Sequence, residues 1–237
     1  MKISDSYNTL VFDCDGVVLN SNTIKTNAFR DVTLQFGESA SASFMTFHKK
    51  NGGVSRYKKF EHFVEVVLPG YVPEFFIKDK HEFLFDLTAQ FAKEIRTGLL
   101  QCEVAKGLTI LREAMPNTRW LVVSGADQTE LRELFYQRGM SNYFDAGIYG
   151  SPEDKLTIVE GLIKSGQMPL PALFLGDSLL DYEVSKAFGL DFIFVHEWTE
   201  LAEWRHFCQQ NNIQTIPSIS HLSGIQKNES FVGVLGE

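Results

Sequence analysis

The sequence has little of what marks secreted, zinc-bound or membrane proteins. Its three cysteines, in 237 residues, are odd in number and widely spread, which suits a reducing compartment and matches no disulfide framework or zinc spacing. No apolar run is long enough to span a bilayer. The first residues lack the apolar segment and cleavage site of a signal peptide. We therefore expect a soluble, cytoplasmic protein without a membrane partner.

Positive charge is also scarce. The chain has 22 Lys and Arg against 30 Asp and Glu, a net charge of -8. General binding to nucleic acid needs a basic face, so we expect no nucleic-acid partner, although a local basic pocket for a small anion is compatible with this balance. No G-x-G-x-x-G motif follows the first apolar run, which argues against a dehydrogenase. The six histidines show no metal-ligand spacing and are expected to pack or face solvent.

Short apolar runs predict the strands of an α/β protein. Runs that are rich in β-branched and aromatic residues stand at 10–12, 120–123, 173–175 and 192–195. Helix-like stretches separate the later runs, and this alternation predicts a doubly wound parallel sheet with both faces covered. Residues 147–150 and 214–220 predict two further short strands. The second is expected at a sheet edge, because Pro217 cannot donate a ladder hydrogen bond.

The interval from 18 to 101 breaks this alternation. Apolar residues recur there at helical spacing, in a stretch far longer than one crossover helix needs. We predict an all-helical insertion at 18–101 in a catalytic core made of 1–17 and 102–237, with the chain returning to the sheet near 103–107. The tail from Ser223 to Glu237 shows little pattern.

Polar side chains follow three of the predicted strands. Asp13, Ser124 and Asp177 each stand where a strand is expected to end. Ligands of an open parallel sheet bind beyond the carboxyl ends of its strands, so the three are predicted to meet in one crevice. Each has a plainer interpretation by itself, because Asp15-Gly16 is a common turn and Ser124 or Asp177 can cap a helix.

The acidic residues in this set have the chemistry of a cation site. Asp13 and Asp15, two residues apart, leave a strand on the same side and can face one Mg²⁺. One carboxylate can attack phosphorus while the other exchanges a proton with the leaving or entering oxygen. Asp177 and Asp181 lie one helical turn apart and can complete the cation shell.

Two further positions suit a phosphoryl group. Ser124 can donate its hydroxyl to a phosphoryl oxygen, and Gly125 permits a close backbone approach. Lys155 follows a Gly-Ser-Pro loop and can neutralise a crowded cluster of carboxylates and phosphate as a point charge.

Together these motifs resemble the haloacid dehalogenase superfamily. Asp-x-Asp-Gly follows the first strand, Ser the second, Lys a Gly-Ser-Pro loop, and Gly-Asp-Ser-x-x-Asp a later strand, in the superfamily's order. The helical insertion resembles the small cap of the phosphoglycolate phosphatase and β-phosphoglucomutase branch. The resemblance implies a Rossmann-like core with its active site under a mobile cap that governs substrate specificity.

The resemblance also implies roles for the motif residues. Asp13 would be the nucleophile that forms an aspartyl-phosphate, and Asp15 the general acid/base whose backbone carbonyl binds Mg²⁺. Asp13 and Asp177 would be side-chain metal ligands, with Asp181 in or near the shell. Ser124 and Lys155 would hold the phosphoryl group. An Asp at position 15 favours phosphate esters over carbon–halogen bonds.

One stretch of the insertion carries a further signal. Asn51–Phe60 reads NGGVSRYKKF, similar to a Gly-Val-Ser-Arg stretch of β-phosphoglucomutase-like caps in which the arginine contacts an anionic part of the substrate. Arg56 is therefore predicted to bind substrate. The neighbouring lysines are expected to be solvated: Lys49, Lys50, Lys58 and Lys59. Asn20-Ser21 departs from the Asp-Ser of many relatives.

These observations favour a Mg²⁺-dependent phosphatase acting on a small phosphorylated metabolite, such as a sugar phosphate. A phosphomutase of the β-phosphoglucomutase type would use the same residues and remains an alternative. A catalytically silent binding protein is less favoured, because Asp13 and Asp15 are both present. We expect a monomer or a small homo-oligomer.

Overall fold

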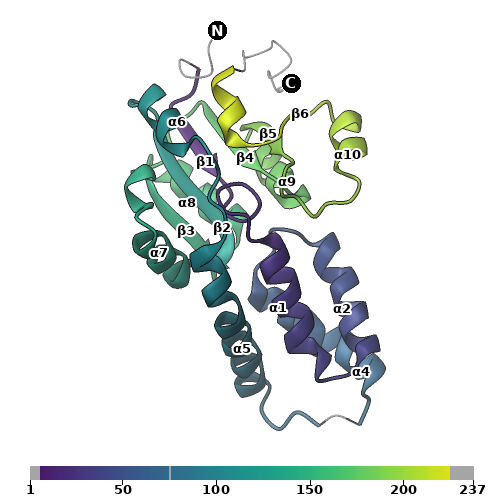
Figure 1. Cartoon of the computed structure of the whole chain (residues 1–237). Helices are drawn as coiled ribbons and strands as arrows, with labels where there is room; N and C mark the ends of the chain where they lie inside the picture. The colour runs from purple at the N-terminus through teal and green to yellow at the C-terminus, as the bar shows by residue number, and fades with distance from the viewer. Residues whose placement is uncertain (1–5, 75, 225–237) are drawn as a thin grey trace.

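The computed structural model describes residues 6–74 and 76–224, and it contains a sheet sandwiched by helices beside a separate group of helices (Figure 1). The sheet has six strands in the order β3-β2-β1-β4-β5-β6, and every neighbouring pair is parallel. The strands are β1 Thr9–Phe12, β2 Arg119–Asp127, β3 Gly147–Ser151, β4 Ala172–Gly176, β5 Asp191–Val195 and β6 Gln214–Ile216. The predicted doubly wound, Rossmann-like fold is confirmed.

The strand order places a crevice between β1 and β4. The chain adds β2 and β3 on one side of β1, then crosses over to add β4, β5 and β6 on the other. At such a switch point the two loops at the carboxyl ends diverge to opposite faces, which opens a binding crevice. Asp13 directly follows β1 and Asp177 directly follows β4. The topology therefore brings these two carboxylates to the crevice.

Two details of the sheet refine the prediction. β2 runs on to Asp127 with a register shift after Val123, so Ser124 lies within a strand and the expected end at Val123 is wrong. β6 is an edge strand that ends directly before Pro217. The expectation of an edge strand there is confirmed.

Both faces of the sheet are covered, which explains why its strands are continuously apolar. Leu10 and Phe12 pack into one apolar cluster and Val11 into the other, as side-chain alternation along a strand requires. One face is covered by α6 Leu108–Ala114, α7 Gln128–Gln137, η3 Ser141–Tyr143 and η4 Ile219–Gly224. The other is covered by α8 Lys155–Lys164, α9 Leu179–Ala187 and α10 Trp204–Gln210.

Between β1 and α6 the described residues of 22–101 form a group of helices, here called the helical unit. They are α1 Asn22–Leu34, α2 Glu38–Lys50, α3 Arg56–His62, the π-helix η2 Phe63–Val67, α4 Leu68–Tyr71 and α5 Lys80–Gln101. The unit has an apolar cluster of its own, rich in phenylalanine: Phe29, Phe44, Phe60, Phe63 and Phe91. This cluster gathers the apolar stripes seen in the sequence, and it lets the unit hold its shape apart from the sheet.

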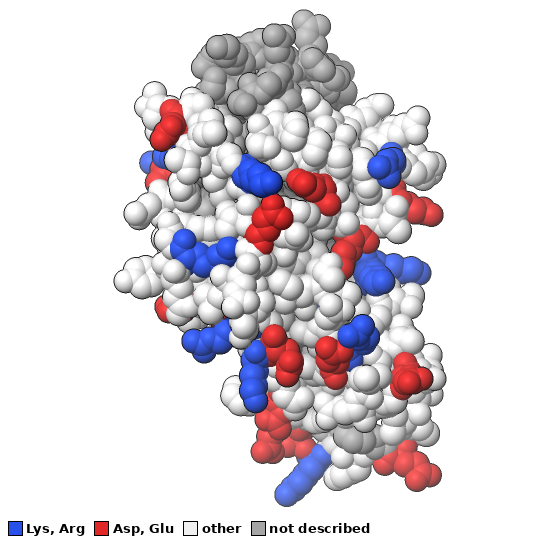
Figure 2. Space-filling model, viewed as in Figure 1, with Lys and Arg blue, Asp and Glu red and all other residues white. Residues whose placement is uncertain are grey.

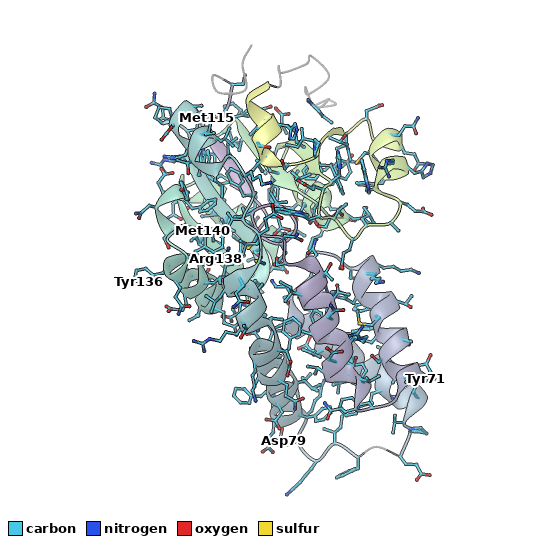
Figure 3. All side chains as sticks on the ribbon, in the orientation of Figure 1. Tyr71, Asp79, Met115, Tyr136, Arg138 and Met140 are labelled. Carbon is cyan, nitrogen blue, oxygen red and sulfur yellow. The ribbon has the colours of Figure 1, made fainter. Side chains whose placement is uncertain are left out.

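The chain leaves the sheet and returns to it along adjacent paths. The amide of Asn20 donates to the carbonyl of Glu103, and that of Ala105 to the carbonyl of Val18, both at 2.9 Å. Arg138, which directly follows α7 and is labelled in Figure 3, donates to the carbonyl of Cys102 at 2.6 Å, just beyond the end of α5. These contacts place the return close to the predicted 103–107.

The surface agrees with the charge balance of the chain. Acidic and basic side chains are interspersed over the face seen in Figure 2. Within 6–74 and 76–224, no helix is long and apolar enough to cross a membrane. Most of the tail from Ser223 lies outside the described residues.

Candidate active site

Three carboxylates and a lysine form the floor of the crevice. Oxygens of Asp13, Asp177 and Asp181 all lie within 4.8 Å of one another, and all three residues are buried. The amino group of Lys155 lies 2.9 Å from Asp13 Oδ1 and 2.6 Å from Asp181 Oδ1. Asp13 Oδ1 also accepts from the amide of Cys14 at 2.7 Å. Two donors therefore fix one oxygen of Asp13, and Oδ2 remains to face the crevice.

The loop after β4 explains the position of Asp181. Ser178 and Asp181 form a capping box at the start of α9, in which Asp181 Oδ2 accepts from the amide and the hydroxyl of Ser178. Both oxygens of Asp181 are thus engaged, one by Lys155 and one by Ser178. Asp181 and Asp13 thus contact the same amino group, that of Lys155.

Gly16 is required by the same crowding. Its φ is +80°, and a Cβ placed there would lie 2.1 Å from Asp177 Oδ2. A larger residue would therefore displace the Asp177 carboxylate. Asp177 Oδ2 also accepts from the side-chain amide of Asn22, at 2.7 Å.

The floor carries more negative charge than Lys155 can offset. Burial raises the pKa of Asp13 to about 7, although Lys155 acts to lower it. Burial, Asp13 and Asp181 together raise the pKa of Asp177 well above its usual value. Buried carboxylate oxygens gathered this closely are the donors that Mg²⁺ prefers, and a divalent cation would offset their mutual repulsion. The donor set therefore fits a magnesium ion held by Asp13 and Asp177.

Asp15 lies in a different environment from Asp13. Its Oδ2 pairs with Lys25 of α1 and its Oδ1 accepts from the hydroxyl of Ser21, both at 2.5 Å. Burial acts to raise the pKa of Asp15, but Lys25 and Ser21 outweigh it, and the pKa is lowered. Two carboxylates two residues apart thus differ in proton affinity, as acid–base pairs in active sites do.

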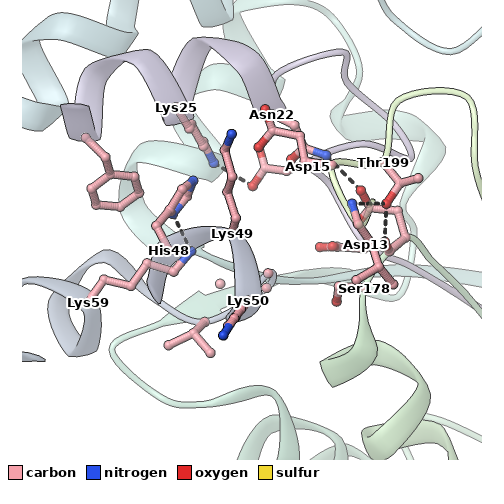
Figure 4. A pocket seen from close by; sticks show the side chains of 18 of the residues that line it. Asp13, Asp15, Asn22, Lys25, His48, Lys49, Lys50, Lys59, Ser178 and Thr199 are labelled. Carbon is pink, nitrogen blue, oxygen red and sulfur yellow. Dashed lines mark hydrogen bonds and ion pairs between the residues drawn. The ribbon is translucent and has the colours of Figure 1, made fainter. Parts of the chain in front are cut away.

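A cavity of about 90 Å³ lies between the floor and the helical unit (Figure 4). This is well below the ~300–1,000 Å³ of pockets for drug-sized ligands, so its ligand is small. Asp13, Asp15 and Asp177 line its floor side. The opposite side is lined by cationic and imidazole groups of the helical unit: Lys25, His48, Lys49, Lys50, Arg56 and Lys59.

Arg56, predicted to contact substrate, has a partner within the protein. Its guanidinium makes two hydrogen bonds to Glu130 of α7, at 3.0 and 2.6 Å, and stacks 5.0 Å from the ring centre of Phe91. The pair links the helical unit to the sheet. Because Arg56 still lines the cavity, its contact with a ligand stays a prediction.

Ser124 and Gly125 lie at the junction of the sheet and the helical unit. A Cβ on Gly125 would lie 2.2 Å from the carbonyl oxygen of Gly53. Gly125 lines the cavity, but its immediate neighbour in the structure is this backbone, where the sequence predicted an approach to a ligand. Ser124 is fully buried behind the cavity, and its Oγ accepts from the amide of Ala126 at 3.1 Å. Its role with phosphate stays a prediction.

Several cavity residues were not predicted from the sequence. Lys59 is only 4% exposed, so the expectation that it is solvated is wrong. His48 is buried and packs against Phe29, as expected of a packing histidine, but it also lines the cavity, which the sequence did not indicate. The available signal was spacing: Lys59 follows Arg56 by three residues and shares its helix face. Lys25 and Glu200 had no comparable signal, because only the closed tertiary structure brings them to the cavity.

Comparison with known proteins agrees with this geometry. The sequence model of the haloacid dehalogenase-like hydrolases matches residues 7–189. No curated protein matches the chain. The solved structures with the same fold include a haloacid dehalogenase-like hydrolase family protein from Streptococcus pneumoniae, which is 17% identical, with a TM-score of 0.63 over 94% of this chain and 100% of that one.

Two further solved structures resemble the chain. A predicted phosphoglycolate phosphatase from Haemophilus somnus is 14% identical, with a TM-score of 0.68 over 93% of this chain and 98% of that one. A β-phosphoglucomutase from Clostridium difficile is also 14% identical, with a TM-score of 0.66 over 91% and 92%. At these identities the likeness concerns the fold alone.

Proposed function

The chain belongs to the haloacid dehalogenase-like hydrolase family, and from this premise we propose that it is a Mg²⁺-dependent phosphatase for a small phosphorylated metabolite. The observation that carries the proposal is that Asp13, Asp15 and Asp177 line one cavity, with the amino group of Lys155 2.9 Å from Asp13. In this proposal residues 18–101 act as a cap over a core of 1–17 and 102–237.

Asp13 is the proposed nucleophile. Its Oδ1 is held by Lys155 and by the amide of Cys14, and Asp13 lines the cavity, so Oδ2 is the oxygen proposed to react. A bond forms between that oxygen and phosphorus as the ester P–O bond breaks, giving an aspartyl-phosphate. Water then attacks the phosphorus and the bond to Asp13 breaks, releasing phosphate.

Asp15 is the proposed general acid/base. It donates its proton to the leaving oxygen as the ester P–O bond breaks, and the ionised Asp15 then takes a proton from the attacking water, which restores it. The ionised form of Asp15, which Lys25 favours, is the form that can accept the proton of that water. Lys25 is thereby a positioning residue of the helical unit that acts through Asp15.

Asp13 and Asp177 would hold the magnesium ion, supported by the backbone carbonyl of Asp15. A bound Mg²⁺ supplies positive charge against the phosphoryl oxygens. Lys155 supplies a second positive charge on the same floor, and Asp181 and Ser178 keep that amino group in place. Holding charges in a site closed to water is most of what phosphoryl transfer requires.

Phosphate release from a panel of phosphorylated sugars and small acids, with Mg²⁺ present, tests the proposal. We expect release by the wild type, loss of release on chelation, and no detectable release by Asp13→Asn. Asp86→Asn, a change of the same kind at an exposed position of α5, should behave as the wild type. Isomerised product without free phosphate would favour the phosphomutase, and no reaction across the panel would contradict both enzymes.

A further inference from the structure

The amino group of Lys59 is a buried cation at the wall of the cavity. Lys59 lies in the last turn of α3 and is only 4% exposed, which is unusual for a charged residue. Its Nζ contacts His48 Nδ1 at 3.0 Å and lies 5.3 Å from the ring centre of Phe29. No carboxylate within 6–74 and 76–224 forms an ion pair with it. A lysine has three donors, and His48 takes one.

A hydrogen-bond chain fixes the direction of this amino group. A Glu200 carboxylate can only accept, so the Thr26 hydroxyl donates to it, at 2.5 Å. Thr26 Oγ1 must then accept from His48 Nε2, at 2.8 Å. The lone pair of His48 therefore stands on Nδ1, where it accepts from Lys59. Burial, with Lys59 second, lowers the pKa of His48 to about 3, in keeping with this neutral ring.

The other cations near Lys59 are already engaged or lie at the rim. Lys25 pairs with Asp15, and Arg56 pairs with Glu130. Lys49 and Lys50 line the cavity but are exposed to solvent. Lys59 is thus the cavity-lining cation that is both buried and without a carboxylate partner among the described residues. Figure 4 shows its side chain extending to His48, on the helical side of the cavity.

The cavity separates two kinds of binding group. Asp13 and Asp177 lie on the floor, and Lys59 of α3 with His48 of α2 lies on the side of the helical unit. A phosphate ester with its phosphoryl group at Asp13 would extend its other end toward Lys59. At about 90 Å³ the cavity keeps the two ends close. An anionic end would complete the donors of Lys59, whereas a neutral hydroxyl would leave the buried cation unpaired.

We propose that Lys59 binds a second anionic group of the substrate, so that the substrate is a small phosphate monoester with negative charge at both ends. The phosphoryl end of this assignment rests on the proposed phosphatase function, but binding at Lys59 does not require turnover. The second group is a carboxylate or a phosphate, since both accept hydrogen bonds from an ammonium group. His48, Thr26 and Glu200 are positioning residues that act through Lys59.

A matched pair of ligands tests the substrate class. Glycerol 3-phosphate and 3-phosphoglycerate have the same carbon skeleton and differ in a terminal hydroxymethyl or carboxylate group. Propane-1,3-diol bisphosphate and the corresponding monophosphate form a second pair, which separates phosphate from carboxylate as the second anion. The readout is the ratio of kcat/KM within each pair, with Mg²⁺, for the wild type and Lys59→Met.

We expect kcat/KM of the wild type to be about 10- to 100-fold higher for the doubly anionic member of at least one pair. A hydrogen bond to a charged group usually changes affinity by about this factor. Lys59→Met should lose that preference, mainly through KM. Lys58→Met, a change at the neighbouring exposed position, should keep it. Thr26→Val breaks the hydrogen-bond chain between His48 and Glu200 and changes no charge. It should reduce the preference for the doubly anionic ligand, an effect that a purely structural role of these hydrogen bonds would not produce.

A binding measurement separates this inference from the phosphatase proposal. Calorimetry with Asp13→Asn, with or without Lys59→Met, reports the preference for the doubly anionic ligand without turnover. If the wild type hydrolyses nothing but Asp13→Asn binds with the preference, the inference about Lys59 stands and the phosphatase fails. Equal affinities within both pairs, or a preference that survives Lys59→Met, would overturn the inference.

Discussion

Replacing the buried cation with an apolar side chain should make the protein more stable at neutral pH. In Lys59→Met a flexible side chain of similar length takes the place of the lysine beside Phe29 and His48. Residues retained for binding are often held at a cost in stability, and their removal then stabilises the fold. The same substitution thus links the inference about substrate to a measurement that needs no substrate.

The magnitude follows from the pKa of the lysine. Burial, together with Lys25, lowers the pKa of Lys59 from 10.5 to about 7. At ~1.4 kcal/mol per pKa unit, this disfavours the charged amine in the folded protein by about 4 kcal/mol at pH 7. The substitution also leaves His48 Nδ1 without its donor, which costs about 1–3 kcal/mol. We expect a net gain of about 1–3 kcal/mol in the free energy of unfolding.

The gain should depend on pH in a definite direction. Between pH 7 and 10.5 the unfolded chain holds the Lys59 proton and the folded protein does not, so the stability of the wild type rises with pH in that window. The cost of the lysine is complete below pH 7 and falls to about 1 kcal/mol at pH 9.5. Lys59→Met should therefore be more stable than the wild type at pH 7 and about equal to it, or less stable, at pH 9.5.

Urea unfolding followed by circular dichroism at the two pH values measures this difference. Lys58→Met is the matched control, because its exposed ion pair with Asp154 should contribute within ~0.5 kcal/mol. A urea midpoint of Lys59→Met below that of the wild type at pH 7 would refute the predicted cost of burying Lys59. A stability gain of Lys59→Met that is the same at pH 9.5 as at pH 7 would refute it as well.

Three other substitutions test the site. Gly125→Ala places a Cβ against the Gly53 carbonyl. Phosphate release should therefore fall at least ~10-fold with little change in Tm, and normal kinetics would contradict the close packing of Gly125 against Gly53. Lys155→Met leaves buried carboxylates unpaired and should lower the unfolding free energy by about 3–5 kcal/mol in urea titrations; an unchanged midpoint would count against it. Glu130→Gln removes the negative charge that pairs with Arg56, and it should raise KM with little change in Tm. Unaltered kinetics would show that the Arg56–Glu130 pair does not contribute to function.

The strands and the acidic cluster were predictable because their signal is local. A buried parallel strand is continuously apolar over a few residues, and its end is marked by the first polar side chain. Asp13 and Asp177 could therefore be placed at strand ends, and the topology brought them together as expected. Ser124 was misplaced relative to its strand because an irregular β2 continues past it.

The far side of the cavity was not predictable in the same way. Arg56 and Glu130 are 74 residues apart, and Thr26 and Glu200 are 174 residues apart. A lysine on an amphipathic helix has the same local pattern whether it faces water or a cavity, so the spacing that places Lys59 on the helix face of Arg56 does not by itself show that this face is buried. The structure differs from the expectation because α1 and α2 pack over that face of α3, through Phe29 and His48. Glu200 of the loop before α10 is linked to His48 through Thr26.

The sequence by itself determined the parallel sheet, the helical unit and the carboxylates at the ends of β1 and β4, because each depends on residues close together in the chain. Only the tertiary structure decided which charges pair. Asp15 is held by Lys25, Arg56 by Glu130 and Lys155 by Asp13 and Asp181, while Lys59 is left facing the cavity. Pairing depends on distance and burial, and both arise only when segments far apart in the chain come together.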